Sequence, residues 1–345
     1  MIKAKYRVLV LTDHRGHSAE NSIYALLRQM CKHPRCAQID IATRGWTGND
    51  TFFKEQKGDQ LQVAAVTPDF AYTEGGDYLT QALRVVNPKD YDLIFLRLPR
   101  PISDEFLGWL ANILEGKAIV NHPQGVVETS TKQFLLNFPE VCPPMQLCRS
   151  TTEVLDFASN FPIVLKPLRE YGGRGLLKID GNTLDDGTTL HDTATYLKEI
   201  EDILQTDGML GMKFLKNVNQ GDKRILVVGG QIMAASLRLP APDSWLCNVA
   251  QGGTSVSATA TPEEEAIIAQ INPKLQQSGI LIYGADTLVD DDGKRVLSEI
   301  NTLSIGGFPQ AEQQTGRPVI QPTIDKIFKY ADAHYAEWPA NDPGF

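Results

Sequence analysis

The sequence predicts an α/β protein with more than one lobe, whose N-terminal part is a doubly wound sheet. Short aliphatic runs alternate with segments of helical periodicity over residues 1–122, an order typical of a parallel sheet covered by helices. The last third is rich in strands joined by tight turns. A chain of 345 residues is also too long for one ordinary core and suits two or three packed lobes.

The N-terminal lobe is expected to span residues 1–122 and to rest on buried strands. β-Branched and aliphatic residues predict strands at 7–11, 38–42, 91–97 and 118–121. Helical spacing predicts helices at 18–30 and 106–114. No GxGxxG sequence follows the first strand, so a dinucleotide-binding role for this lobe is not supported.

Residues 123–207 are expected to form a second lobe. After a turn at the boundary, a helix is predicted through Lys132 and Leu136, and another at 195–205. Strands predicted at 161–168 and 176–179 flank a glycine-rich turn that contains Gly172 and Gly173. A strand, a glycine turn and a return strand are typical of a hairpin.

Residues 208–335 are expected to form a strand-rich third lobe, with a poorly ordered tail at 336–345. Gly229 and Gly230 between two aliphatic runs predict a tight hairpin. Thr261 is a good N-cap for a helix at 263–278. Two further strands are predicted at 281–286 and 295–301, joined by an acidic turn.

Composition disfavours several classes of partner. With 42 acidic and 33 basic residues the net charge is −9, which disfavours a nucleic-acid or acidic-membrane binder. No apolar run approaches the length of a membrane span, and the N-terminus has no signal-peptide pattern. The five cysteines show no CxxC spacing. We therefore expect a cytoplasmic protein with small-molecule substrates.

One strand end carries oxygen ligands for a metal ion. Glu299 and Asn301 are two residues apart on an extended strand, so their side chains share a face, and Asp286 on the preceding strand can reach that face. Carboxylate and amide oxygens suit Mg²⁺, with Mn²⁺ as an alternative. Taken alone, the three residues fit a solvated strand end better than a metal site.

Cationic and glycine-rich features accompany this strand. Lys166 ends a strand just before Gly172 and Gly173, whose backbone can approach phosphate oxygens closely. Arg224 and Arg238 can face one pocket across the predicted hairpin. Each feature alone also fits surface charge or a loose loop. No GK[ST], HExxH or GxSxG sequence points to another chemistry.

Taken in order, these features resemble the ATP-grasp superfamily, and most closely the bacterial-type glutathione synthetases. The matching stretches are 94–97, 104–106, 119–124 with Thr131 and Lys132, 164–168 with Gly172 and Gly173, 221–228, 238–240, Asn248 with Gly252 and Gly253, 284–286, and 299–301. The match keeps its order over nearly the whole chain and is far more specific than any single motif.

The resemblance implies an ATP-grasp fold in which two lobes clamp ATP behind an N-terminal α/β domain. It implies that Lys132, Lys166, Gly172 and Gly173 contact the nucleotide. The hinge whose backbone reads adenine would be Met212, Lys213, Phe214 and Leu215, and Asp222 and Asn248 would be further nucleotide contacts. Asp286, Glu299 and Asn301 would hold Mg²⁺, and Arg224 and Arg238 would act in catalysis on the transferred phosphate and the acyl substrate.

The family's reaction activates a carboxylate with ATP as an acyl phosphate, which an amine then attacks. The first hypothesis is a glutathione synthetase that joins γ-glutamylcysteine and glycine; a ligase with another acceptor and a non-catalytic ATP-binding protein are the alternatives. The chain departs from the family's best-known members at 98–101 and at 302–308. The second loop lies where the amine acceptor is expected to bind, so the sequence leaves the identity of the acceptor open. Family members are commonly homo-oligomers.

Overall fold

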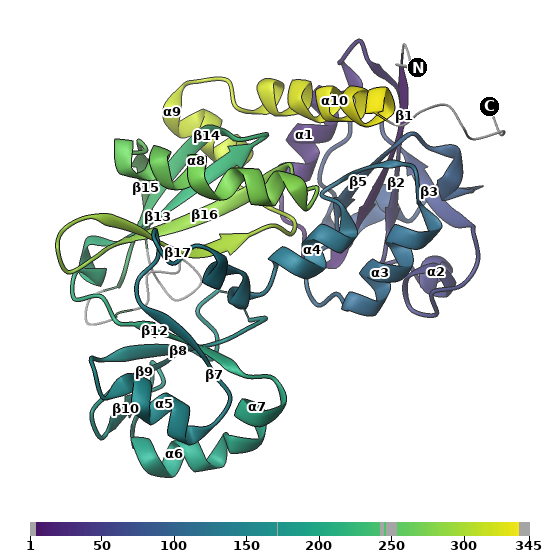
Figure 1. Cartoon of the computed structure of the whole chain (residues 1–345). Coiled ribbons are helices and arrows are strands. Elements are labelled where there is room, and N and C mark those ends of the chain that lie inside the picture. Colours follow the sequence, from purple (N-terminus) through teal and green to yellow (C-terminus); the bar gives the residue numbers. More distant parts are fainter. Residues whose placement is uncertain (1–4, 171, 242–244, 246–253, 338–345) are drawn as a thin grey trace.

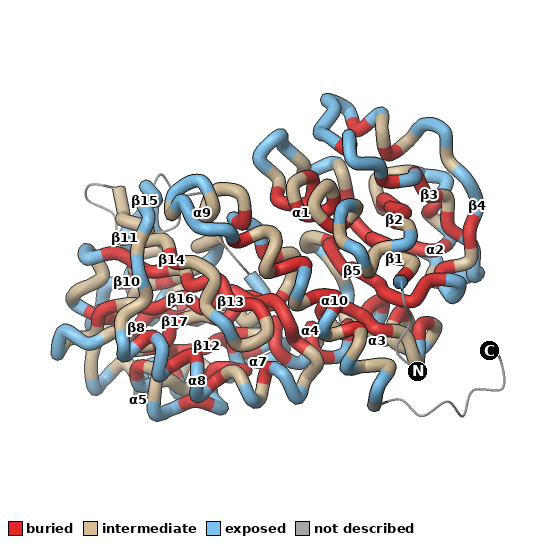
Figure 2. The backbone as a smooth tube through the Cα atoms, turned by 90° about the horizontal axis from the view of Figure 1, so that it is seen from above, coloured by how far each residue is buried: buried red, intermediate tan, exposed pale blue. Residues whose placement is uncertain are grey.

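The protein is built from three sheets, one in each lobe (Figure 1). The computed structural model describes residues 5–170, 172–241, 245 and 254–337. Buried residues are concentrated in the central strands of each lobe, and exposed residues lie on the outer loops (Figure 2). Within the described residues, no helix is both long and apolar enough to cross a lipid bilayer.

The N-terminal lobe is a six-stranded sheet in the order β4-β3-β2-β1-β5-β6. Its parallel part consists of β1 (Tyr6–Thr12), β2 (Cys36–Thr43), β5 (Leu93–Arg97) and β6 (Ala118–Val120), as the aliphatic runs predicted. The sequence reading missed the antiparallel edge strands β3 (Leu61–Ala65) and β4 (Arg84–Val86). Helices α1 (Ser22–Cys31), α2 (Asp50–Phe53) and α3 (Asp104–Ile113) complete the lobe.

The C-terminal helix α10 (Ile320–Glu337) packs on this first lobe (Figure 1). Its buried Ile324, Ile327 and Phe328 join the core of β1 and α1. The Tyr6 hydroxyl donates a 2.6 Å hydrogen bond to Asp332. The chain therefore returns to the N-terminal lobe after completing the third one.

The small lobe carries the sheet order β11-β10-β9-β8-β12-β7. Its strands are β7 (Met145–Cys148), β8 (Ile163–Pro167), β9 (Leu177–Asp180), β10 (Thr183–Asp185), β11 (Leu190–Asp192) and β12 (Met209–Lys213). Its helices are α5 (Thr151–Ala158), α6 (Thr193–Glu199) and α7 (Glu201–Thr206). The hairpin predicted around the glycine turn is confirmed by the antiparallel pair β8 and β9. Because β12 completes this sheet, the sheet extends to Lys213, past the boundary expected at residue 207.

Two predicted helices of this region differ from the structure. The helix expected through Leu136 is wrong, because α4 (Pro123–Thr129) ends before Thr131, which is extended, and only a 3₁₀ turn (Lys132–Asn137) follows. The extended backbone lets the Lys132 amide donate to the Leu168 carbonyl at 2.9 Å. The helix expected at 195–205 is broken at Ile200, where ψ is 10° and α6 gives way to α7.

The third sheet has the order β15-β14-β13-β16-β17. Its strands are β13 (Asp222–Val228), β14 (Gln231–Leu239), β15 (Thr254–Ala258), β16 (Ile282–Val289) and β17 (Arg295–Asn301). The tight hairpin is confirmed, since β13 and β14 pair across Gly229 and Gly230, which both have positive φ. Thr261 caps α8 (Pro262–Gln277) as predicted, and α9 (Phe308–Thr315) follows β17.

Asn121 joins the N-terminal lobe to the third sheet. Its side-chain oxygen accepts from the amides of Leu281 and Ile282, both at 2.9 Å. Its side-chain nitrogen donates to the carbonyls of Ile282 at 2.6 Å and Thr302 at 2.7 Å. All four hydrogen-bonding positions of this buried amide are thus used in one contact between the two lobes.

Candidate functional site

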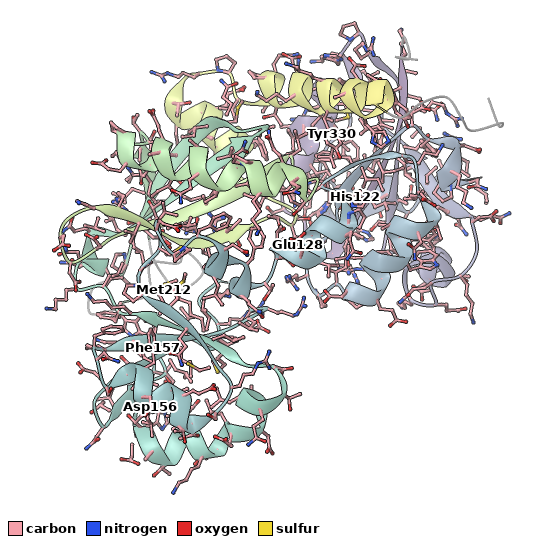
Figure 3. The ribbon with its side chains drawn as sticks, viewed as in Figure 1. His122, Glu128, Asp156, Phe157, Met212 and Tyr330 are labelled. Carbon is pink, nitrogen blue, oxygen red and sulfur yellow. The ribbon has the colours of Figure 1, made fainter. Side chains whose placement is uncertain are left out.

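A cleft lies between the small lobe and the third sheet. Strand β12 and the segment after it form one wall, and β13, β16 and β17 contribute the other. Met212, labelled in Figure 3, belongs to the first wall. The lining residues are Val164, Lys166, Leu176, Met212, Lys213, Phe214, Leu215, Val218, Asp222, Trp245, Leu288, Ser298 and Glu299. The cleft thus gathers the predicted hinge, Lys166, Asp222 and Glu299.

The predicted hinge forms an apolar end of this cleft. Met212 and Leu215 are buried, and Val164 and Leu288 add aliphatic surface. The amides of Lys213 and Phe214 are already used, since they donate to the carbonyls of Pro144 at 2.9 Å and Pro162 at 2.8 Å. A planar apolar ring can therefore pack here, but it cannot bind those two amides.

Two lysines lie near Glu299 at the polar end: Lys166, which is partly buried and lines the cleft, and Lys132, which is buried. Lys166 Nζ lies 3.4 Å from the Ser298 carbonyl, and burial lowers the Lys166 pKa to about 8 even though the Glu299 carboxylate opposes the shift. Lys132 Nζ donates to the Glu170 carbonyl, and burial lowers its pKa too, again against the charge of Glu299. The two ammonium groups are desolvated even though carboxylates lie near them, and a phosphate bound between them would favour their charged forms.

Arg224 and Arg238 meet at Asp286, as expected for two arginines across one hairpin. Arg224 forks onto both carboxylate oxygens of Asp286, with Nη2 at 2.6 Å from Oδ2. Arg238 spans two acids, with Nε and Nη2 each 2.6 Å from Asp222 and Nη2 also 2.7 Å from Asp286. Bidentate contacts of this kind fix the guanidinium planes.

Charge and burial act in opposite directions on this network. Burial and the neighbouring Asp286 charge raise the pKa of Asp222 to about 6. Burial also opposes ionisation of Asp286, but the charges of Arg224 and Arg238 outweigh it and lower the Asp286 pKa. Burial opposes the charge of Arg238 as well, and its two carboxylate partners raise its pKa. The cluster therefore keeps both arginines charged inside the protein.

The three predicted metal ligands share one face. Asp286 pairs with Glu299 across β16 and β17, and Gly284 pairs with Asn301. The Asn301 side-chain nitrogen is buried and has no hydrogen-bond partner within the described part of the chain. No group of three His, Cys, Asp or Glu residues among those described could hold a metal by itself. The carboxylate oxygens of Asp286 and Glu299 and the side-chain oxygen of Asn301 are of the kind that Mg²⁺ takes, with the rest of its oxygens from phosphate and water.

The glycine turn lies between β8 and β9 at the edge of the cleft. Gly172 and Gly173 have φ of 69° and 79°, values that residues with a Cβ rarely adopt. Their amides are therefore presented by a backbone that other residues would not form. Asn248, predicted as a further nucleotide contact, lies outside the described residues.

A second cavity lies at the carboxyl ends of β1 and β5, where open α/β sheets commonly bind ligands. Arg97 ends β5 with only 7% of its surface exposed, and burial lowers its pKa to about 10. No carboxylate among the described residues lies within ion-pair distance of it. Sequence reasoning noted this arginine only as part of a matching stretch; its position at the end of a buried parallel strand was the available signal.

The loop after β17 closes this second cavity from the other lobe. Ser304, Gly306 and Gly307 line it together with Thr12, Asp13 and His17. Ser304 Oγ donates to the Leu98 carbonyl at 2.7 Å, which holds the loop against β5. Burial lowers the pKa of His17 to about 4, so this ring is neutral near pH 7.

Comparison with known proteins agrees with this arrangement. Residues 131–316 match the family model described as "Prokaryotic glutathione synthetase, ATP-grasp domain". A glutathione synthetase of Rhodopseudomonas palustris is 30% identical over 83% of this chain and 95% of its own length. Among solved structures, D-cycloserine synthetase DcsG has a TM-score of 0.61 at 11% identity, covering 96% of this chain and 99% of its own. The D-alanine-D-alanine ligase of Coxiella burnetii also scores 0.61, at 12% identity over 97% and 96%. These last two likenesses establish the ATP-grasp fold alone.

Proposed function

Because this chain belongs to the prokaryotic glutathione synthetase family and is an ATP-dependent ligase of the ATP-grasp fold, we propose that it joins γ-glutamylcysteine to glycine. A substrate carboxylate oxygen attacks the terminal phosphorus of ATP, which gives an acyl phosphate and ADP. The amine nitrogen then attacks the acyl carbon, the tetrahedral intermediate expels phosphate, and the amine loses a proton. An amide bond forms and one phosphoanhydride bond breaks.

The observation that carries this proposal is the pair of desolvated lysines near Glu299, of which Lys166 lines the cleft. Lys132 and Lys166 are desolvated cations near Glu299, and the negative charge of a triphosphate chain bound there would stabilise their charged forms. The apolar end at Met212 and Leu215 suits a purine ring. We assign Asp222 to the same site because it lines the cleft, while Gly172 and Gly173 would cover the phosphates.

Asp286, Glu299 and Asn301 would hold Mg²⁺, with Mn²⁺ as an alternative. A divalent cation bound there would neutralise charge on the phosphate oxygens during transfer. The chain's own contribution is the pair of arginines beside it. Arg224 and Arg238 are already held by Asp286 and Asp222, so their orientation costs little reorganisation when negative charge develops on the transferred phosphoryl group.

The second cavity is assigned to the peptide substrate and the acceptor. Arg97 supplies a buried guanidinium for a substrate carboxylate, and the neutral His17 lies at the same cavity. The loop at 302–308 brings Gly306 and Gly307 there, and neither residue has a side chain to fill the cavity. This open space favours a second candidate function, a ligase that accepts a bulkier amine than glycine.

We further propose that the enzyme works in the cytoplasm as a homo-oligomer. Four cysteines, Cys31, Cys36, Cys142 and Cys148, are free thiols in the structure, as suits a reducing compartment. Light scattering of the purified protein measures the oligomeric state directly, and a monomer at micromolar concentration would overturn that part of the proposal.

The test is phosphate release from ATP in the presence of γ-glutamylcysteine and a panel of amines. We expect release that requires Mg²⁺, the dipeptide and an amine together, with glycine or a close analogue preferred. Release without any amine, or no release at all, would overturn the synthetase proposal. A clear preference for a larger amine would select the second candidate function.

A further inference from the structure

Glu264 is a fully buried carboxylate on the face of the third sheet that points away from the cleft. It lies in the first turn of α8 and has no exposed surface. Helix α8 covers this face with Ile267, Ile271 and Leu275. A buried charge is costly unless it is paired and hydrogen-bonded, so its partners define what it does.

Both carboxylate oxygens of Glu264 bind side chains of the sheet. Oε2 accepts from Lys223 Nζ at 2.7 Å, and Oε1 accepts from Thr287 Oγ1 at 2.6 Å. The amide of Thr261 also donates to Oε2 at 2.8 Å, which fixes the carboxylate to the helix start. Arg295 Nε lies 3.8 Å from Oε1 and adds β17 to the same cluster.

The two sheet partners of Glu264 are paired with each other. Lys223 of β13 lies opposite Thr287 of β16, and the next pair in the register is Arg224 with Asp286. Successive side chains on a strand point to opposite faces. Lys223 and Thr287 therefore point to α8, while Arg224 and Asp286 point into the site.

We propose that Glu264 is a positioning residue for the phosphate-binding arginine and the predicted metal ligand. By holding Lys223 and Thr287 together, it fixes the backbone of β13 and β16 one residue away from Arg224 and Asp286. This inference rests on the proposed function, because it is the productive placement of these two side chains that Glu264 secures. Nothing in the sequence around Glu264 beyond a helix start indicates this role.

The test compares Glu264→Gln with two matched controls on the same helix. Ile271→Val thins the packing of α8 on the sheet without touching Lys223 or Thr287, and Glu265→Gln removes an exposed neighbouring charge. We expect Glu264→Gln to lower kcat by about tenfold or more, since small misplacements of reacting groups are costly. The KM for ATP should change little. Ile271→Val should lower the denaturation midpoint and leave kcat unchanged, and Glu265→Gln should change neither.

If Glu264→Gln behaves like Ile271→Val, with lost stability and unchanged kcat, the positioning role is wrong. Should the single variant fail to fold, the pair Glu264→Gln with Lys223→Met removes both buried charges together, and wild-type kcat in that pair would equally contradict the proposal.

Hydrogen exchange of β13 and β16 gives a readout that does not depend on turnover. Amides of 222–228 and 282–289 should exchange faster in Glu264→Gln and not in Ile271→Val. A wild-type protein without phosphate release would overturn the proposed function, and the exchange comparison would still decide whether Glu264 holds the two strands. Equal rates of amide exchange in Glu264→Gln and Ile271→Val would show that Glu264 does not hold the two strands in place.

Discussion

The side chain of Arg224 lies across the backbone of Gly284. A Cβ atom at position 284 would stand 2.9 Å from Arg224 Cδ, closer than real Cβ contacts allow. Gly284 lies two residues before Asp286 on β16, and the Arg224 guanidinium binds the Asp286 carboxylate. The absence of a side chain at one position of the sheet thus gives the arginine its path to its partner.

Gly284→Ala should therefore displace Arg224 and lower kcat by about 10- to 100-fold. Overpacking at this site should also lower the free energy of unfolding by about 1–3 kcal/mol. Steady-state kinetics and urea denaturation measure the two effects. Gly108→Ala is the control, because a Cβ at this position of α3 meets nothing within 4 Å. Unchanged kcat in Gly284→Ala would show that the position of Arg224 is not critical.

The pKa of Lys166 predicts a pH dependence of ATP binding. Burial lowers this pKa to about 8, so the ammonium is charged below that pH and loses its proton as the pH rises through it. The dissociation constant for ATP should therefore increase between about pH 7.5 and 9.5, by at most tenfold per pH unit. Calorimetric titration measures it.

Lys166→Arg is the control for that titration, since a guanidinium stays charged throughout the range. Its ATP affinity, whatever its absolute value, should be flat with pH. The same slope in both proteins would mean that another group titrates and that Lys166 does not bind phosphate.

Glu299→Gln should raise the Mg²⁺ concentration needed for half-maximal rate by at least about tenfold, because one of the two proposed carboxylate ligands loses its charge. Varying Mg²⁺ at saturating ATP measures this requirement. Asp292→Asn removes an exposed carboxylate from the turn between β16 and β17 and should leave it unchanged. A normal Mg²⁺ requirement in Glu299→Gln would show that the metal assignment is wrong.

Arg97→Met should raise the KM for the dipeptide by about 10- to 100-fold while leaving the KM for ATP unchanged, because a charged hydrogen bond to a substrate carboxylate is lost. The substrate-free protein should unfold at the same or a higher denaturant concentration, since a buried guanidinium without a carboxylate partner is costly. A selective increase in the KM for ATP would instead place Arg97 in the nucleotide site.

Local patterns predicted the parts of the fold that local chemistry decides. The hairpin at Gly229 and Gly230, the cap at Thr261 and the shared face of Glu299 and Asn301 all follow from turn geometry, capping and the period of a strand. The fold family came from the order of many such features along the chain.

Features that depend on tertiary contacts could not be predicted in this way. The pairing of Asp222 with Arg238 depends on a register that shifts between Leu226 and Val227, and periodicity does not reveal such a shift. The early end of α4 depends on the Leu168 carbonyl, which is distant in sequence from the Lys132 amide that it binds. Neither contact produces a pattern in the adjacent sequence from which it could be predicted.

The four hydrogen bonds of Asn121 bear on how substrates enter and leave. They tie the N-terminal lobe to β16 and to Thr302, so the second cavity is bounded by two parts that are fastened to each other. The small lobe has no share in that fastening. We therefore expect that the cleft opens and closes by movement of the small lobe, while the N-terminal lobe and the third sheet stay together. Nucleotide could then exchange without disturbing the cavity assigned to the peptide.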